Sequence, residues 1–194
     1  MPHLPPITKA LMLACVAGFC LNLFVPLDRW FALWPLMSGH FMPWQVLSYA
    51  FLHGDTLHLF FNMLGLWMFG AELEQMWGSR RYWQFLLAAV LVAALSQLLI
   101  TLLAGSNVPT VGASGALFGL LLAFGMLFPN RTIMPLFPPI PMKARNFVIL
   151  FGGFELLMGV WGGSGIAHFA HLGGMLGGWL MIRHWRRSGP WRRG

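Results

Sequence analysis

Charged side chains are scarce in this sequence. Only 9% of the 194 residues are charged, and just five are acidic, whereas a soluble domain carries about 25% charged residues. Because 58% of the residues are hydrophobic, the chain lacks the polar groups to cover a soluble globule of this length. The composition excludes an ordinary soluble domain and indicates a single integral membrane domain over residues 1–194.

Cysteine is nearly absent as well. Cys15 and Cys20 both lie in the first apolar run, five positions apart, so they do not share a helix face. We expect two free thiols and no disulfide framework. The run has no clear cleavage site before Pro26, so we expect it to remain as a membrane span rather than to be removed as a signal peptide.

Long apolar runs dominate what is present. A membrane span needs roughly 20 apolar residues, and six candidate runs occur, of which the fourth and fifth are short. The runs are Thr8–Val25, Leu57–Leu73, Tyr82–Leu103, Ser114–Phe128, Asn146–Trp161 and Ile166–Arg183. We predict an all-α membrane protein in which six transmembrane helices form one bundle.

The net charge of +7 comes from basic residues that flank these runs. With six spans and the N-terminus inside, every Lys and Arg except Arg29 falls on the inner side, most densely in a short tail at about residues 184–194. This asymmetry predicts that both termini face the cytoplasm. Basic membrane edges favour contact with the lipid bilayer, and we expect no nucleic-acid partner.

The connecting segments are unusual in composition. Residues 26–56 lie on the outer side but are rich in apolar side chains, and Trp30, Trp34 and Trp44 suit a membrane interface. We therefore expect this first outer loop to be partly embedded in the membrane. On the inner side, Met134–Lys143 is rich in proline and cannot be helical throughout.

One polar site is the serine of "TVGASGALFG" (residues 110–119), where an apolar run resumes after a loop. If that loop dips into the membrane, Ser114 begins a helix below the outer surface. Free N–H groups and the helix dipole there favour a developing negative charge. A buried nucleophile is one interpretation, and a helix cap or small packing residue is the other.

Two histidines, His168 and His171, open the last run and precede glycines that are spaced four apart. Small residues at this spacing let two helices approach closely. The pairs are Gly173 with Gly177 and Gly174 with Gly178 in the last run, and Gly115 with Gly119 in the fourth. Because His171 shares the face of Gly174, we expect it to reach a hydroxyl on the fourth helix. The alternative is two interfacial histidines.

The second run begins with a further pair of polar side chains. His58 and Asn62 lie one helical turn apart, after a capping residue that is either Asp55 or Thr56. An imidazole and an amide stacked in this way provide hydrogen-bond donors at the outer end, with His53 just before them. The alternative is a structural bond from Asn62 to a neighbouring helix.

The acidic residues are assigned differently. Glu72 and Glu74 lie at the inner end of the second run, beside Arg80 and Arg81, which predicts a structural pairing role. Glu155 lies midway along the fifth run, and its pattern leaves two interpretations open. It is either a hydrogen-bonded structural acid or a proton carrier.

His58, Ser114 and His171 all fall near the outer ends of their runs, and serine with imidazole is the minimum for an activated nucleophile. Over residues 44–178 the sequence resembles the rhomboid family of intramembrane serine proteases. The family patterns HxxxxHxxxN, GxSG and AHxxG occur as His53-His58-Asn62, Gly112-Ala113-Ser114-Gly115 and Ala170-His171-Leu172-Gly173-Gly174.

The resemblance implies roles for these residues. Ser114 would be the nucleophile and His171 the general base and then the acid, in a dyad that no carboxylate completes. The Ser114 N–H and the side chains of His58 and Asn62 would hold the oxyanion. The implied supporting positions are His53, Gly112, Gly115, Phe118, Gly174, Gly178 and Glu74. No metal or other cofactor is expected.

The resemblance also implies a location and a substrate. The active site would face the outer side of a bacterial inner or plasma membrane and would cut transmembrane segments of other membrane proteins. The family's Trp-Arg pattern in the first loop is Trp44-Gln45 here. Aromatic residues of the fifth run would form a lateral gate. They are Phe147, Phe151, Phe154 and Trp161.

Four alternatives stay open. The chain could be a catalytically inactive rhomboid relative that binds or chaperones membrane proteins, or a rhomboid dedicated to one class of surface proteins. A transporter using Glu155 would predict inverted repeats, which we do not find. A metalloenzyme could use the histidines at positions 53, 58, 168 and 171, but the sequence has no HExxH and no carboxylate or thiolate nearby.

Overall fold

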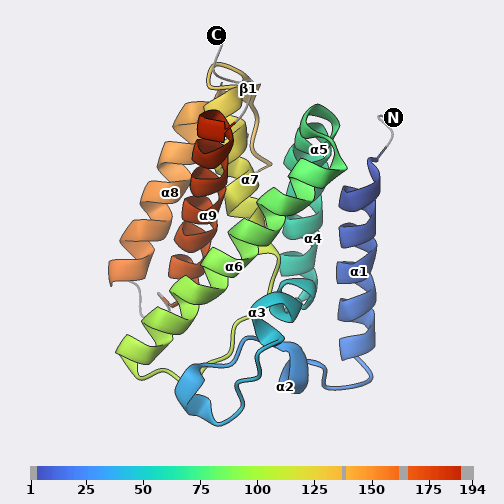
Figure 1. The fold of residues 1–194 in the computed structure, drawn as a ribbon, viewed down its shortest axis with the longest axis vertical. Helices are drawn as coiled ribbons and strands as arrows, with labels where there is room; N and C mark the ends of the chain where they lie inside the picture. Colours follow the sequence, from blue (N-terminus) through green and yellow to red (C-terminus); the bar gives the residue numbers. More distant parts are fainter. Residues whose placement is uncertain (1–3, 137–138, 162–165, 189–194) are drawn as a thin grey trace.

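The computed structural model describes residues 4–136, 139–161 and 166–188, and each of the six apolar runs is helical (Figure 1). The helices are α1 (Pro6–Asn22), α4 (Thr56–Gly65), α5 (Ala71–Trp77), α6 (Ser79–Ala104), α7 (Ser114–Leu127), α8 (Ala144–Trp161) and α9 (Ile166–Ser188). The second run comprises α4 and α5, which the π-helical segment η3 (Leu66–Gly70) joins into one rod. Because α9 continues to Ser188, the first part of the expected tail is helical, and residues 189–194 lie outside the described residues.

Helix length and composition test the predicted spans. Among the described residues, α6 and α8 are long and apolar enough to cross a membrane. α1 and α7 are apolar but shorter than this test requires. The helices confirm a mostly helical fold. The count of six membrane spans stays a prediction, because the length and composition test identifies two of them.

The segment after α7 is not helical throughout, as expected for Met134–Lys143. After α7, the strands β1 (Thr132–Ile133) and β2 (Met142–Lys143) pair antiparallel, with Thr132 opposite Lys143. Prolines between the strands prevent a helix, and residues 137–138 lie outside the described residues. The two extended dipeptides instead form backbone hydrogen bonds with each other.

The first loop folds into short helices at the end of the bundle away from the start of α1 (Figure 1). They are α2 (Asp28–Phe31), η1 (Leu36–Ser38), α3 (Gln45–Ser48) and η2 (Tyr49–Phe51). The Gln45 side chain is fully buried. Its Oε1 accepts from the backbone N–H groups of Trp34 (3.2 Å) and Met42 (3.1 Å). Its Nε2 donates to the carbonyls of Trp30 (3.2 Å) and His40 (3.0 Å). A neutral amide thus anchors this loop where the family pattern has arginine.

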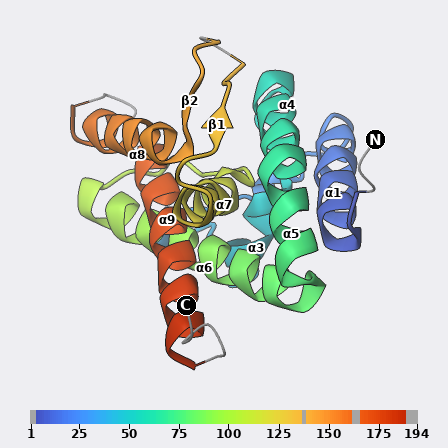
Figure 2. The same ribbon diagram turned by 90° about the horizontal axis from the view of Figure 1, so that it is seen from above.

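Paired glycines let α9 pack against two neighbours at once. Seen from above, α9 lies beside α6, α7 and α8 (Figure 2). A methyl group on Gly178 would lie 3.2 Å from the backbone of Gly119, and one on Gly177 would lie 2.6 Å from the carbonyl oxygen of Ala88. One glycine pair therefore faces α7 and the other faces α6, and larger side chains would force these helices apart.

Glu74 ties three helices together at the opposite end of the bundle. Its carboxylate accepts from the backbone N–H groups of Ile7 (2.9 Å) and Thr8 (2.7 Å) at the start of α1. It also accepts from the hydroxyls of Thr8 (2.8 Å) and Ser79 (2.7 Å). These partners replace the neighbouring arginines that the sequence suggested. The carboxylate satisfies the free N–H groups of a helix that has no side-chain cap of its own.

Gln45→Glu tests the anchor of the first loop. The carboxylate keeps an acceptor for Trp34 and Met42 but sets its other oxygen against two carbonyls. We expect the free energy of unfolding to fall by about 2–4 kcal/mol, because two part-buried hydrogen bonds are lost and a buried carboxylate oxygen is set against the carbonyls that accepted them. Thermal unfolding in detergent measures this, with Gln84→Glu as the control at an exposed position of α6. An unchanged midpoint in Gln45→Glu would contradict the anchoring role.

Candidate active site

α7 begins deep inside the bundle. The loop that follows α6 turns back alongside the helices before α7 starts (Figure 1). Backbone hydrogen bonds hold this segment to the first loop. Leu33 and Thr110 each donate an N–H to the carbonyl of the other, and the Gly112 N–H donates to the carbonyl of Tyr49 (2.9 Å). Gly112 has a φ of 125°, a conformation that glycine adopts without strain. Ser114 follows as the first residue of α7.

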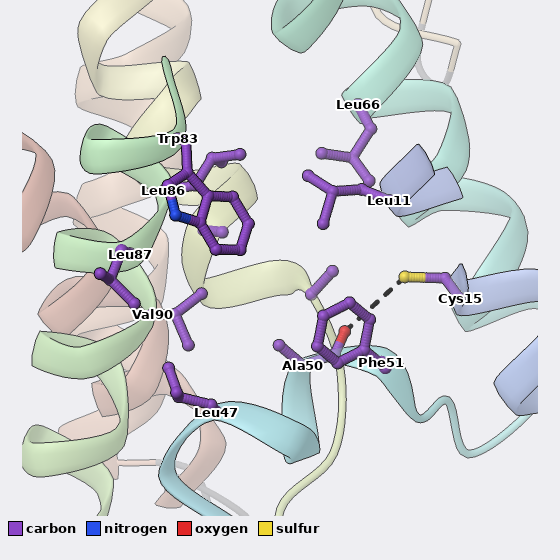
Figure 3. Close-up of a pocket in the computed structure, with 12 residues that line it drawn as sticks. Leu11, Cys15, Leu47, Ala50, Phe51, Leu66, Trp83, Leu86, Leu87 and Val90 are labelled. Carbon is purple, nitrogen blue, oxygen red and sulfur yellow. Dashed lines mark hydrogen bonds between the residues drawn. The ribbon is translucent and has the colours of Figure 1, made fainter. Parts of the chain in front are cut away.

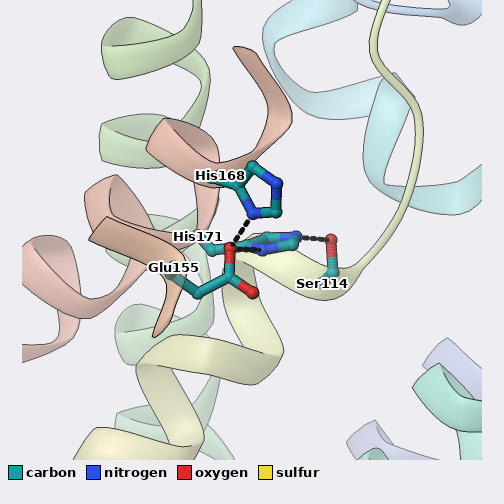
Figure 4. Close-up of polar contacts among 4 residues, drawn as sticks. All are labelled: Ser114, Glu155, His168 and His171. Carbon is teal, nitrogen blue, oxygen red and sulfur yellow. Dashed lines mark hydrogen bonds and ion pairs between the residues drawn. The ribbon is translucent and has the colours of Figure 1, made fainter. Parts of the chain in front are cut away.

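His171 contacts Ser114 directly. The distance between His171 Nε2 and Ser114 Oγ is 2.8 Å (Figure 4). The Phe118 ring, one turn along α7, stacks on the His171 ring with centroids 4.4 Å apart and planes within 5°. Of the two candidate histidines, the structure therefore brings His171 to the serine. The serine, the imidazole and the expected aromatic ring come together as one unit.

Backbone contact between α7 and α9 sets this distance. A methyl group on Gly174 would collide with the carbonyl group of Gly115, which follows the serine. A methyl group on Gly119 would lie 2.9 Å from the carbonyl oxygen of Gly174. Because both helices lack side chains here, the short reach of serine and histidine is enough to join them.

His58 lies over the loop that precedes the serine. A methyl group on Gly112 would lie 2.7 Å from Nε2 of His58 and 3.5 Å from Oγ of Ser114. Glycine at this position therefore leaves a small space that borders both side chains. Asp55 is the N-cap of α4, and its Oδ1 accepts from the backbone N–H of His58 (2.8 Å). Of the two candidate capping residues, Asp55 is the one observed.

Asn62 is buried one turn deeper than His58. Its Nδ2 donates to the backbone carbonyl of His58 (2.9 Å). Its Oδ1 is buried without a hydrogen-bond partner among the described residues. The side chain therefore bonds within its own helix, rather than to a neighbouring one, while part of its hydrogen-bonding capacity stays unused.

Glu155 corrects the expectation that no carboxylate reaches the histidine. Its Oε2 lies 2.8 Å from Nδ1 of His171 and 2.6 Å from Nδ1 of His168 (Figure 4). The sequence carried a signal for this contact. Glu155 lies about 9 Å from the end of α8 and His171 about 8 Å from the start of α9 at 1.5 Å per residue, so the two share one depth.

Glu155 and the two histidines are also a set of side chains that could in principle hold a metal ion. Atoms of Glu155, His168 and His171 lie within 4.8 Å of one another. This overturns the premise that no carboxylate lies near the histidines. Ligands of a tetrahedral zinc ion, with bonds of 2.0–2.1 Å, lie about 3.3 Å apart, whereas the oxygen–nitrogen separations here are 2.6 and 2.8 Å. The spacing fits hydrogen bonds better than metal ligation.

An apolar cavity of about 150 Å³ lies between α1, α3 and α6 (Figure 3). It borders α7 at Ala113 and Ala116, and its lining is apolar except for Cys15, whose Sγ contacts the carbonyl oxygen of Ala50. Both cysteines are free thiols, as expected, with Cys15 buried and Cys20 exposed. Neither Ser114 nor His171 lines this cavity, so it is distinct from the serine and histidine site.

His53 precedes α4 and is buried beside His58, with ring centroids 5.1 Å apart. Neither ring nitrogen has a hydrogen-bond partner among the described residues. Burial, together with repulsion by His58, lowers the pKa of His53 from 6.5 to about 4. The ring is therefore neutral at pH 7.

This lowered pKa predicts acid sensitivity of the fold. The unfolded chain takes up the His53 proton near pH 6.5 and the folded chain only near pH 4, so stability falls as the pH drops through this window. We expect the thermal midpoint to fall less between pH 7 and pH 5 in His53→Gln than in the wild type. Thermal unfolding at both values measures the two slopes, and equal slopes would contradict the prediction.

Comparison with known proteins identifies the family of this chain. A family profile for the rhomboid domain matches residues 40–187. The chain is 31% identical over 186 residues to "Rhomboid protease GlpG" of Yersinia pestis, covering 91% of this chain and 61% of the relative. It is 34% identical over 145 residues to "Rhomboid protein 1, mitochondrial" of Saccharomyces cerevisiae, covering 70% of this chain and 40% of the relative.

The chain therefore spans at most about three fifths of the length of these curated relatives. The matched region nevertheless contains the serine, both histidines and the glycines that bring α7 and α9 together. With most of its length matched and its helices packed around these residues, the chain belongs to the rhomboid family.

Proposed function

We propose that this chain is an intramembrane serine endopeptidase that cleaves transmembrane segments of other membrane proteins. The observation that carries the proposal is the 2.8 Å contact between Ser114 Oγ and His171 Nε2, with Phe118 stacked on the imidazole. A nucleophile within hydrogen-bond reach of a positioned base is the arrangement that nucleophilic catalysis requires. The relatives named as rhomboid proteases support the same reaction.

The reaction proceeds through an acyl-enzyme. Ser114 Oγ attacks the scissile carbonyl carbon while His171 Nε2 takes the hydroxyl proton. The tetrahedral intermediate collapses as this proton passes to the leaving amine and the C–N bond breaks. A water molecule then gives a proton to His171 and attacks the Ser114 ester, which releases the carboxylate product and restores the hydroxyl.

The oxyanion would lie in the space that Gly112 leaves open. The Ser114 backbone N–H at the start of α7, the His58 imidazole and the Asn62 amide are its proposed donors. His58 Nε2 and Ser114 Oγ border this space from two sides. Donors that are already in place cost no reorganisation when the charge develops.

The surface of the bundle supports a membrane location. In the first loop, Trp30, Phe31 and Met37 expose their side chains, as expected for a loop embedded in lipid. Basic residues cluster where α1 begins and α9 ends, so we assign that end to the cytoplasm. The site then opens toward the outer side, and a substrate helix must unwind locally because its amides are otherwise hydrogen-bonded within the helix.

α8 is the proposed lateral gate. Phe154 and Trp161 are exposed on it, whereas Phe147 is buried and packs against Phe151 with ring centroids 4.3 Å apart. Spacings of four, three and seven residues place all four aromatic residues on one side of α8, which is covered at Phe147 and exposed at the other three. An inactive relative that only binds membrane proteins is the rival function, and the intact pairing of Ser114 with His171 favours the protease.

Cleavage of a transmembrane test substrate in detergent tests the proposal. We expect the wild type to cut it and to react with a fluorophosphonate, with the adduct located on Ser114 by mass spectrometry. Ser114→Ala should do neither, because the nucleophile is gone. Ser48→Ala, at a serine of α3 whose hydroxyl donates to the carbonyl of Phe31 in the first loop, is the control and should cut and label normally. A folded wild type that neither cuts nor labels would favour the binding protein.

Asn62→Ala tests the oxyanion donors. We expect kcat to fall by about 10²–10³-fold with little change in KM, since one such donor contributes about 3–4 kcal/mol in the transition state. Asn62→Asp should lose more, because a carboxylate repels the oxyanion. Steady-state kinetics on the test substrate gives both constants. Wild-type kcat in Asn62→Ala would remove Asn62 from the oxyanion site.

A further inference from the structure

A single carboxylate oxygen joins two histidines beside the nucleophile. Oε2 of Glu155 lies 2.8 Å from Nδ1 of His171 and 2.6 Å from Nδ1 of His168 (Figure 4). Glu155 is buried, with 6% of its surface exposed, and it reaches the site from α8, whereas both histidines lie on α9. A buried acid in an apolar helix is costly unless its partners satisfy it.

We propose that Glu155 is a positioning residue for the base, so that this chain acts through a serine–histidine–glutamate triad. The proposal rests on the proposed protease function. Glu155 contacts His171 on the nitrogen opposite to the one that faces Ser114. This is the position of the third group in triads on unrelated folds, where a carboxylate orients the histidine.

The contact fixes the tautomer of His171. A carboxylate oxygen only accepts hydrogen bonds, so Nδ1 of His171 carries the hydrogen when it donates to Glu155. Nε2 then presents its lone pair to the Ser114 hydroxyl, as a general base must. Phe118 stacks on the ring but has no polar atom, so it cannot select between the two tautomers.

The contact also favours the charged form of the base. When His171 takes the Ser114 proton, its ring becomes a cation between the Phe118 face and the Glu155 carboxylate. An opposite charge at hydrogen-bond distance in an apolar interior stabilises this cation strongly. The same charge slows the loss of the proton to solvent until the leaving amine takes it.

His168 has a supporting part in this arrangement. Its Nδ1 donates to the same Oε2, and its ring is nearly perpendicular to that of His171 at 6.3 Å. It therefore holds the carboxylate in place without contacting Ser114. This gives the first histidine of the segment HFAH (residues 168–171) a structural role.

The test compares Glu155→Gln with the wild type on the transmembrane substrate, with active sites titrated by exhaustive fluorophosphonate labelling. We expect kcat per titrated site to fall on the order of 10²-fold or more, as when a triad carboxylate becomes an amide. KM should change by less than about twofold, because Glu155 does not contact the substrate. Glu155→Asp should recover part of the lost kcat by restoring the charge.

Glu72→Gln is the matched control, since this glutamate pairs with Arg131 at the other end of the bundle. It should keep the wild-type kcat per site. If Glu155 only stabilised the fold, Glu155→Gln would lower the thermal midpoint and the titrated fraction but leave kcat per site unchanged. Such a result would overturn the proposal while leaving the protease function intact, because the wild type would still cut and label.

His168→Ala and a chelator complete the experiment. His168→Ala keeps the contact between Glu155 and His171, so we expect a smaller loss of kcat than in Glu155→Gln. A full loss in His168→Ala with none in Glu155→Gln would overturn the proposal. So would loss of wild-type activity on chelation with recovery on adding Zn²⁺, since the three residues would then be metal ligands.

Discussion

The close contact between the backbones of α7 and α9 is the constraint on which the site depends. Gly115 lies next to Ser114, and Gly174 lies one turn after His171, so the helices approach most closely where the chemistry is proposed. Serine is too short to reach across an ordinary helix–helix distance of 8–10 Å. Glycine on both helices removes this obstacle, and the second pair, Gly173 and Gly177, holds α9 to α6 so that its position is fixed from two sides.

Hydrogen bonding divides the polar side chains in and around the site into two sets. Ser114, His171, Glu155 and His168 satisfy one another in a chain of contacts, which rigidifies them. His53 and Asn62 instead keep buried atoms without partners among the described residues. Unsatisfied buried groups are rare in proteins and call for an explanation. The unpartnered atom of Asn62 is its Oδ1, an acceptor, so an oxyanion could not be its partner, and only the Nδ2 group of this side chain can donate to the proposed oxyanion.

The sequence was informative wherever a pattern is local. Apolar runs predicted the helices to within a few residues, the glycine spacing predicted the packing face, and the position of His171 on that face distinguished it from His168. Glu155 was missed because its partners lie 13 and 16 residues away on another helix, so the shared depth of the two runs, rather than a local pattern, was the signal for the contact. The β-hairpin and the four bonds of Gln45 were missed for a related reason, since both depend on pairing between distant backbone segments.

The placement of Glu155 links catalysis to the position of α8. This helix packs against α9 and α7, and it carries both the carboxylate at the base and the exposed aromatic face of the proposed gate. If α8 swings outward to admit a substrate helix, Oε2 leaves His171 and the base loses its tautomer control. The triad is then complete only when α8 has closed again. On the proposed roles of α8 and Glu155, a gate that carries this carboxylate would suppress reaction of Ser114 while the site is open to the membrane.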